Sequence, residues 1–582
     1  GPGTRAKGYK DGGAIINGGV DPEFGNVAHT RTFTVSGGRV DVLFDPAPTE
    51  FAVSSGGLAR LALLPATAAG VRIGNRSLAV AVVVLGTIDT AAAPRSQSTV
   101  LANGDPNLVT ITVDDIRDSS GALVPDGAQV AVSTLGGCNN RDRTNACINS
   151  AGGDIVGGAI DPEYGNVAHT RVFTVTNGQF TFQYDPSPIN IQVSTTATAV
   201  VQLIPARTNG TRIGNRAFEE IPIILTSPVA SQTSVSVQPA SVLADDGDRR
   251  TTIIVSNITD GNGVPVPNGT KVVVSTLGGC NNRYSDNGCI SSAGGQIIGG
   301  AVDPEYGNVT HTRVLTVQSG QLQIVYSSLG LALGTRQTGT AVVQLIPSNP
   351  AGVRIGNRTF ATADVTLAGY DQASIVANPT SVTATGVSQI VHVTVTGILD
   401  AAGAPIPDGA KVVVSTLGGC NFRDRNNACL DSAGGSIANG DVSPNYGNVA
   451  HTRVLTVQNG NVSIDYDPAS VLVGVGFTAT ATVVVVPARP DGSLIGNRGF
   501  IYASILLSPP TTDAMHVTIA PDSVLANGGD NEVTITVTNI TNAQGQPVPD
   551  GTKVAVSTLG DCNLRDAANS CVSSAGGTIV GG

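Results

Sequence analysis

A segment of about 140 residues occurs four times along this chain, and this repetition limits the possible folds more than any other feature. The stretch GGAIINGGVDPEFGNVAHTR, near the start of the chain, returns three times in similar form. Its histidine falls at His29, His169, His311 and His451, which gives steps of 140, 142 and 140 residues. Repeats of this length can each form a domain, so we expect a row of similar domains rather than one large core.

Short stretches of alternating apolar and polar residues fill each repeat, with turn residues between them. HTRVFTVTNGQFTFQYDP (169–186) predicts a hairpin around Asn177-Gly178, which is a strong two-residue turn signal. The 72 glycines and 32 prolines suit many short strands joined by turns. No helical periodicity lasts more than a few residues, so the sequence predicts an all-β fold with one β-sandwich per repeat.

The cysteines form four pairs with the same spacing, eight residues between the two members of each pair. Paired zinc ligands usually lie two to four residues apart, so metal binding fits this spacing poorly. An even count in local pairs predicts four disulfides and an oxidising, extracellular environment. The pairs are Cys138 with Cys147, Cys280 with Cys289, Cys420 with Cys429, and Cys562 with Cys571.

One part of each repeat resembles a known family. PASVLADDGDRRTTIIVSNITDGNGVPVPNGTKVVVSTLGG (239–279) is similar to the opening half of the bacterial immunoglobulin-like repeats of invasin and intimin, and TATATVVVVPA (478–488) resembles their closing strands. The resemblance fades across the cysteine loop and the DPEYGNVAHTR segment. It implies tandem immunoglobulin-like β-sandwich domains in an elongated rod, which in that family usually serves as a stalk.

The repeat boundaries divide the chain into three complete units and two partial ones. Residues 1–88 carry only the later strands of a unit, and residues 511–582 carry only the earlier ones. The complete immunoglobulin-like repeats are expected at 91–228, 231–368 and 371–509. Each partial unit would leave an apolar face and strand edges uncovered, so we expect the two to complete each other between copies. Such a head-to-tail contact does not close on itself and predicts a filament, with a second copy of the chain as partner.

Alternatives to the filament stay open at this stage. The chain could be a segment of a covalently continuous stalk of a large cell-surface adhesin. Lys7 stands where the second cysteine of a unit should be, and residues 1–11 match no other unit, which favours natural ends. A carbohydrate-binding or enzymatic module is the third alternative, but no aromatic platform or acid pair recurs.

The recurring polar residues do not form a catalytic pattern. His29, His169, His311 and His451 recur without a serine or carboxylate that would complete a catalytic group, so we interpret them as strand histidines. The acids of DPE at Asp21, Asp161 and Asp303 become Ser443 in the fourth copy. The sequence therefore predicts a protein that is not an enzyme and needs no cofactor.

Calcium is the one cofactor that the sequence leaves open. Asp245, Asp246 and Asp248 form an oxygen-rich stretch, but their spacing is not kept at Asn527. We expect a polar turn there, with calcium binding as the alternative.

Two further sets of basic residues recur at fixed repeat positions. Lys271, Lys411 and Lys553 share a strand position with Gln129, so a lysine–asparagine isopeptide bond cannot be general, and exposed strand lysines are expected. The arginines of IGNR are expected to anchor a hairpin loop against a carbonyl or an acid. They are Arg76, Arg216, Arg358 and Arg498.

Charge and surface motifs limit the classes of partner that we expect for this protein. The net charge is −11 and no cluster of lysine or arginine occurs, so we expect no nucleic-acid partner. No apolar run reaches the length of a membrane span, so no membrane insertion is expected; cell-surface or matrix glycans are a possible second partner. Eight sequons could carry N-linked glycans if the source has the machinery. They lie at Asn75, Asn209, Asn257, Asn268, Asn308, Asn357, Asn461 and Asn539.

Overall fold

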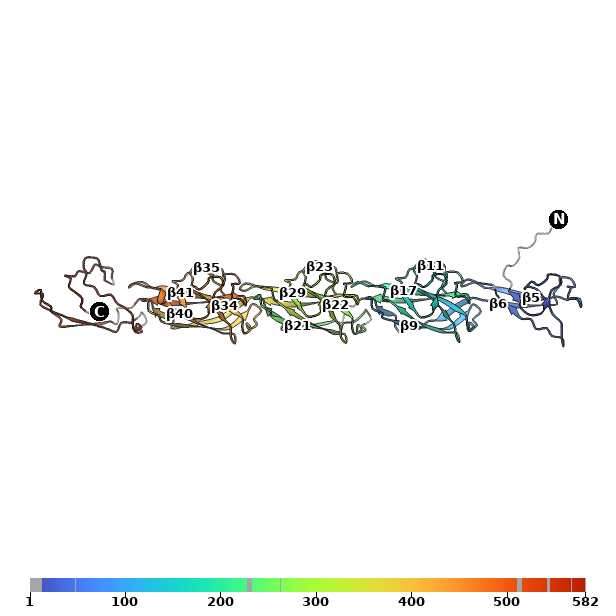
Figure 1. The fold of residues 1–582 in the computed structure, drawn as a ribbon, viewed down its shortest axis with the longest axis horizontal. Coiled ribbons are helices and arrows are strands. Elements are labelled where there is room, and N and C mark those ends of the chain that lie inside the picture. Colours follow the sequence, from blue (N-terminus) through green and yellow to red (C-terminus); the bar gives the residue numbers. More distant parts are fainter. Residues whose placement is uncertain are drawn as a thin grey trace, which may run out of the picture.

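A computed structural model describes residues 13–47, 49–227, 233–261, 263–509, 515–541, 545–566 and 568–580. Three complete β-sandwiches follow one another in an elongated row, with an incomplete segment at each end of it (Figure 1). Within the described residues, the one helical element is a single 3-10 turn, η1 (Pro468–Ser470). The predicted all-β fold of tandem immunoglobulin-like sandwiches is therefore confirmed.

Five units are named here by their residues. They are the N-terminal segment (13–86), sandwich 1 (88–227), sandwich 2 (233–368), sandwich 3 (370–508) and the C-terminal segment (515–580).

Sandwich 1 consists of two facing sheets and a small hairpin. The six-stranded sheet has the order β14-β15-β10-β17-β18-β8, and the four-stranded sheet has the order β13-β16-β9-β7. Only the β18–β8 pair is parallel. The strands are β7 (Ile88–Ala92), β8 (Thr99–Leu101), β9 (Val109–Asp118), β10 (Gln129–Ser133), β11 (Gly137–Arg141), β12 (Cys147–Ile148), β13 (Asp154–Val156), β14 (Ala159–Ile160), β15 (Thr170–Thr174), β16 (Phe180–Asp185), β17 (Ala197–Ala206) and β18 (Glu219–Thr226).

Sandwiches 2 and 3 repeat this strand order. In sandwich 2 the strands are β19 (Ser234–Gln238), β20 (Ser241–Leu243), β21 (Arg250–Ser256), β22 (Lys271–Ser275), β23 (Gly279–Arg283), β24 (Cys289–Ile290), β25 (Gln296–Ile298), β26 (Ala301–Val302), β27 (Thr312–Thr316), β28 (Leu322–Ser327), β29 (Thr338–Pro347) and β30 (Ala361–Ala368). In sandwich 3 they are β31 (Tyr370–Asn378), β32 (Ser381–Thr383), β33 (Val391–Asp400), β34 (Lys411–Ser415), β35 (Gly419–Arg423), β36 (Cys429–Leu430), β37 (Ser436–Ile437), β38 (Asp441–Val442), β39 (Thr452–Thr456), β40 (Val462–Asp467), β41 (Ala479–Ala488) and β42 (Ile501–Ser508).

The core of each sandwich is built from the inward side of the alternating strands. Along β9, Val109, Ile111 and Val113 are fully buried, whereas the residues between them face outward. Tyr184 fills the end of this core, and its hydroxyl donates to the carbonyl of Gly152 at 3.0 Å. Gly153 adopts a φ of 107° against the tyrosine ring, where a Cβ atom would lie 2.4 Å from the hydroxyl oxygen. Only glycine fits at this position.

The six-stranded sheet is covered on its outer face as well, and this explains the unbroken apolar run in β10. The disulfide hairpin β11–β12 lies over that face, where Ile148 packs in one cluster with Ala131 of β10 and Ile204 of β17. The residues that lengthen the unit beyond the resemblance to the invasin-type repeats therefore form a third layer. β10 consequently lies between strands on both sides and layers on both faces, and it is the most enclosed strand of the unit.

Neighbouring sandwiches share their cores at the junctions. Leu101 and Val193 of sandwich 1 pack in the core cluster of sandwich 2, and Leu243 of sandwich 2 packs in that of sandwich 3. Val53 of the N-terminal segment does the same with sandwich 1. Because the N-terminal segment and the first two sandwiches each insert an apolar side chain into the next unit, these junctions are held by packing as well as by the chain.

The two end segments contain fewer strands and no complete sheet in the described residues. The N-terminal segment has β1 (Ala14–Ile15), β2 (Gly19–Val20), β3 (Arg31–Thr32), β4 (Phe44–Asp45), β5 (Gly57–Leu63) and β6 (Ala79–Leu85), which pair only two by two. The C-terminal segment has β43 (His516–Ala520) and β44 (Thr534–Thr538), which pair with each other.

Candidate functional site

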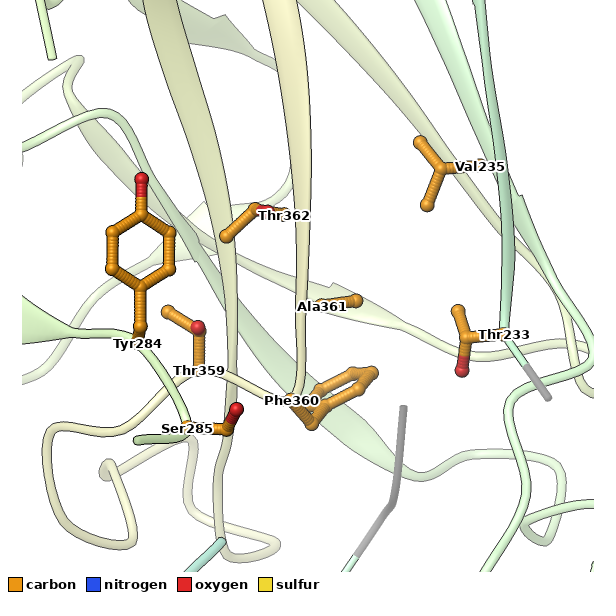
Figure 2. A pocket seen from close by; sticks show the side chains of 8 residues that line it. All are labelled: Thr233, Val235, Tyr284, Ser285, Thr359, Phe360, Ala361 and Thr362. Carbon is orange, nitrogen blue, oxygen red and sulfur yellow. The ribbon is translucent and has the colours of Figure 1, made fainter. Parts of the chain in front are cut away.

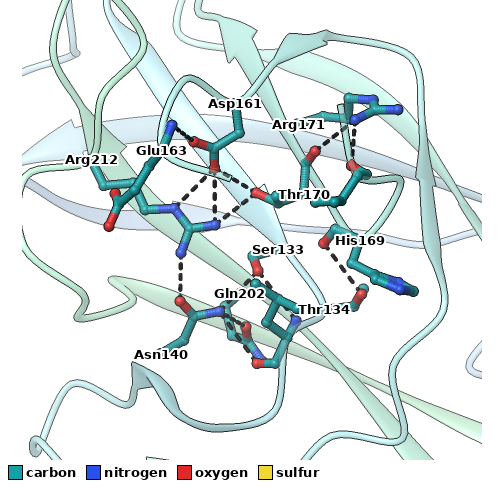
Figure 3. Close-up of polar contacts among 12 residues, drawn as sticks. Ser133, Thr134, Asn140, Asp161, Glu163, His169, Thr170, Arg171, Gln202 and Arg212 are labelled. Atoms are coloured by element: carbon teal, nitrogen blue, oxygen red, sulfur yellow. Dashed lines mark hydrogen bonds and ion pairs between the residues drawn. The ribbon is translucent and has the colours of Figure 1, made fainter. Parts of the chain in front are cut away.

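A buried polar network lies between the six-stranded sheet of sandwich 1 and its outer layer (Figure 3). Arg212 Nη2 lies 3.0 Å from Asp161 Oδ2, and the two side chains are 2% and 0% exposed. Arg212 Nη1 donates to Asn140 Oδ1 at 2.6 Å, and Asn140 Nδ2 in turn donates to Gln202 Oε1 at 2.6 Å. The ring of Tyr164 covers the guanidinium, whose central carbon is 4.4 Å from the ring centroid. The network joins the cysteine hairpin, the DPE turn and β17 into one unit.

The same network recurs in sandwich 2 and is replaced in sandwich 3. In sandwich 2, Arg354 Nη2 lies 3.1 Å from Asp303 Oδ2, and Asn282 donates to Gln344 at 2.6 Å. Sandwich 3 has apolar or small residues at all four positions and packs them instead, with Tyr446 beside Phe422 at 5.8 Å between ring centroids. The replacing residues are Phe422, Ser443, Val484 and Leu494. Because one unit dispenses with the polar groups, we interpret the network as structural.

The carboxylate of Asp303 is held ionised by its surroundings. Burial alone would raise its pKa, but hydrogen bonds from the Thr312 hydroxyl and the Glu305 backbone N–H, together with the charge of Arg354, outweigh this effect. The pKa of Asp303 therefore lies below its usual value. A buried carboxylate with a lowered pKa is a poor general acid at neutral pH, which again fits a structural role.

The recurring histidines make backbone contacts. Nδ1 of His169 lies 3.1 Å from the carbonyl oxygen of Gly153, and His311 and His451 repeat this contact at 2.7 Å. His29 lies 2.8 Å from the carbonyl oxygen of Gly13. These rings fix the glycine turn beneath the core tyrosine. The predicted backbone contact is found, but the histidines lie in the turn that precedes the strand and not in the strand itself.

The three aspartates considered for calcium each pair with a different arginine. Asp245 Oδ2 lies 2.8 Å from Arg249, Asp248 Oδ2 lies 2.6 Å from Arg250, and Asp246 Oδ2 lies 3.2 Å from Arg489 of sandwich 3. Within the described part of the chain, no three histidine, cysteine or acidic side chains converge as a metal site would require.

The predicted lysine and arginine positions lie at strand surfaces and at the cysteine hairpin. Lys271 and Lys411 donate to Thr316 and Thr456 at 3.1 and 2.7 Å. Arg216 Nε lies 3.3 Å from Asn145 Oδ1 in the hairpin loop.

All four cysteine pairs are disulfide-bonded, and each bond closes one hairpin of the outer layer or its counterpart in the C-terminal segment. The eight sequon asparagines are exposed. A shallow open depression lies on sandwich 2 and is shown in Figure 2. Its lining holds no carboxylate, imidazole or thiol among the described residues. It is lined by Thr233, Val235, Tyr284, Ser285, Thr359, Phe360, Ala361 and Thr362.

The strongest functional feature is the exposed apolar surface of the end segments. In the C-terminal segment, Val554 and Val556 are 64% and 66% exposed, although the equivalent Val130 and Val132 of β10 are fully buried. In the N-terminal segment, Leu78 is 75% exposed, although the equivalent Phe218 is 2% exposed. In the complete sandwiches the equivalent side chains belong to the core, whereas in the end segments they are exposed.

Asp161 was singled out from the sequence, but its network partners Arg212 and Asn140 were not. The signal for them was present: Arg212, Asn140 and Gln202 change to apolar residues together in sandwich 3. Positions that change together between internal repeats indicate contact, even when they lie 51 to 72 residues apart.

No protein family matches this sequence, and no curated protein does. Among solved structures, an ectodomain fragment of ICAM-5 is 11% identical, with a TM-score of 0.20 over 74% of this chain and 80% of that one. Three domains of titin are 9% identical, with a TM-score of 0.18 over 73% of this chain and 99% of that one. Activated alpha-2-macroglobulin of Escherichia coli is 10% identical, with a TM-score of 0.14, and this chain spans 42% of its length.

TM-scores this low support no conclusion about function, so the class of protein rests on strand order. The order and the two facing sheets define a tandem-repeat protein of immunoglobulin-like sandwiches. A closer relationship to the invasin and intimin repeats stays a prediction. None of the described residues belongs to a helix that is long and apolar enough to cross a membrane.

Proposed function

We propose that this is an extracellular structural protein whose copies join head to tail, each joint completing one immunoglobulin-like sandwich. One observation supports this most directly: the two end segments hold complementary halves of the same unit. The N-terminal segment contains the counterparts of β13 to β18, in that order, at a spacing of 140 residues. The C-terminal segment contains the sequences equivalent to β8 to β12, and the two segments overlap only at the equivalent of β13, which recurs at 578–580.

The missing strands would enter at defined places. β10 lies between β15 and β17 in sandwich 1, and their counterparts β3 and β5 have no strand between them. Residues 553–557 of a second copy are the equivalent of β10. By analogy with the pairing of Val132 with Leu203, Val556 would lie opposite Leu63. This strand has the fully apolar inward face that the gap requires.

The joint would gain most of its free energy from apolar burial. Covering a valine or leucine side chain contributes about 1.5–3 kcal/mol. Val554, Val556, Leu78 and Val35 are all more than half exposed, and their equivalents in sandwich 1 are buried. Several such contacts suffice for a stable joint even after the entropy of ordering is subtracted.

A filament follows from the geometry of the row. The two segments lie at opposite ends of three linked sandwiches, so one chain cannot join its own ends (Figure 1). A contact between two different surfaces propagates as an open polymer. The disulfides of the three sandwiches and the C-terminal segment are consistent with assembly outside the cell.

Val556→Asp in the full chain tests the proposal, because a carboxylate in the central strand would be buried without a partner. We expect the unmodified chain to form filaments in electron micrographs and the variant to remain as single rods in size-exclusion chromatography. Val442→Asp, at a half-exposed position of sandwich 3, is the matched control and should elongate normally. An unmodified chain that stays monomeric at all concentrations would favour the continuous adhesin stalk instead.

A further inference from the structure

The contacts that close the outer layer in the complete sandwiches follow a pairing rule: the two side chains that meet there are either both polar or both apolar. The side chain at the second position after the first cysteine of a unit meets the side chain in the middle of the strand β17 or its equivalent. Asn140 Nδ2 donates to Gln202 Oε1 at 2.6 Å, and Asn282 donates to Gln344 at the same distance. In sandwich 3 both members are apolar: Phe422 is fully buried and Val484 is 1% exposed in one cluster.

The same two positions are divided between the end segments. Leu564 occupies the cysteine-loop position in the C-terminal segment, and Ala62 occupies the strand position in the N-terminal segment. Both are apolar, so the divided pair obeys the rule although its members lie at opposite ends of the chain. Neither has its partner within one copy: Ala62 is exposed, and Leu564 is 38% exposed.

The contact between neighbouring units differs in charge from one junction to the next. Arg207 of sandwich 1 pairs with Glu50 of the preceding segment, and Arg207 Nη2 lies 2.7 Å from Glu50 Oε2. At the outer end of sandwich 3, Leu472 occupies the position of Glu50 and is 77% exposed. The loop equivalent to that of Arg207 in the N-terminal segment reads Thr67-Ala68-Ala69. At the junction between sandwiches 2 and 3 these two positions hold Ala332 and Arg489, and Arg489 pairs with Asp246 instead. At the outer end of sandwich 3, an apolar side chain would face a small loop without charge.

From the divided pair and from the uncharged residues at this junction we infer that Leu564 and the exposed end of sandwich 3 around Leu472 form a self-recognition surface, and that its occupant is the 62–69 stretch of a second copy. The inference rests on the proposed head-to-tail joint and adds what makes it selective. A unit with the polar pair of sandwiches 1 and 2 would not fit, because one amide would face an alkyl side chain. The joint thus differs chemically from sandwiches 1 and 2, which have the polar network. Strands of those two sandwiches would therefore not replace the matching strands of the end segments in the joint.

Three variants of the full chain test this inference: Ala62→Gln, Leu564→Asn and the two combined. Ala62→Gln places an amide oxygen against Leu564, and we expect the association constant for elongation to fall about tenfold. The combined variant re-creates the pair of Asn140 and Gln202, with Arg72 available as Arg212 is, because Arg72 already lies 3.1 Å from Asp21. Its association constant for elongation should lie within about twofold of that of the unmodified chain. Leu564→Asn alone should lower this association constant less than Ala62→Gln does, because Arg72 and Ser557 can form hydrogen bonds with the new amide.

Ala402→Gln, at an exposed turn of sandwich 3, is the control for the added amide and should have no effect. Elongation can be followed by light scattering from sonicated filament seeds. The inference is overturned if Ala62→Gln elongates normally, or if the combined variant is no better than Ala62→Gln alone. Both outcomes leave the proposed filament intact. Only an unmodified chain that fails to elongate from any seed would remove the head-to-tail joint itself.

Discussion

Arg212 and Asp161 form an ion pair that is almost completely buried, with Arg212 Nη2 3.0 Å from Asp161 Oδ2. Sandwich 3 holds the same fold with Leu494 and Ser443 at these two positions. A buried ion pair is often no more stabilising than well-packed apolar residues, but breaking it leaves a buried charge alone. The chain contains both solutions to the same packing problem.

Arg212→Leu should therefore destabilise sandwich 1 by about 3–5 kcal/mol, because Asp161 would stay buried without its cation. Transferring the whole sandwich 3 set, Asn140→Phe, Asp161→Ser, Gln202→Val and Arg212→Leu, should recover most of this loss. Hydrogen exchange of the β10 and β17 amides in the full chain measures both effects, with the amides of sandwich 2 as the internal standard. Equal protection in the single variant and the unmodified chain would contradict the structural role of the pair.

Acid should affect sandwich 2 before sandwich 3. The pKa of Asp303 is lower in the folded state than in the unfolded chain, so its contribution to stability is complete above about pH 4, the unfolded pKa. That contribution is lost as the pH falls through the lower, folded pKa. Sandwich 3 carries Ser443 at this position and lacks the effect. Hydrogen exchange between pH 5 and about pH 2.5 should show β22 losing protection before β34; the reverse order would be inconsistent with this assignment.

The strands and turns were predictable because their signals are local. Alternation along 169–186 and the signal at Asn177-Gly178 predict two strands with a tight turn between them, and β15, β16 and the Thr176–Gln179 bridge are found there. The predicted hairpin pairing is wrong, because β15 pairs within the six-stranded sheet and β16 within the facing four-stranded sheet. The outer layer was not predictable in this way. The apolar run of β10 shows that both faces are covered but does not show that the cysteine hairpin covers one of them. The insertion of Leu101 into the neighbouring core depends on how two units meet, which no periodicity within one unit encodes.

A designed disulfide should report the register of the proposed joint. Thr112 and Thr181 lie opposite each other on β9 and β16, with 3.3 Å between their hydroxyl oxygens, and their equivalents in the end segments are Thr536 and Asp41. Thr536→Cys combined with Asp41→Cys should give a ladder of covalent oligomers under non-reducing conditions, because the two side chains meet across the joint. Moving the second cysteine two residues along, Leu43→Cys, should weaken the ladder strongly. Equal ladders from both pairs would show that the register is wrong.

The exposed Leu472 offers a test of the junction between successive copies. Leu472→Glu should slow elongation severalfold, because the carboxylate would lose water against the Thr67-Ala68-Ala69 loop. Adding Thr67→Arg re-creates the pair formed by Glu50 and Arg207 and should restore part of the loss, although a pair at a solvent-accessible junction contributes at most about 1 kcal/mol. Leu329→Glu, at a position of sandwich 2 that is 40% exposed, is the control. If Leu472→Glu elongates as fast as this control, then Leu472 lies outside the contact between copies, and the end of sandwich 3 faces solvent in the filament.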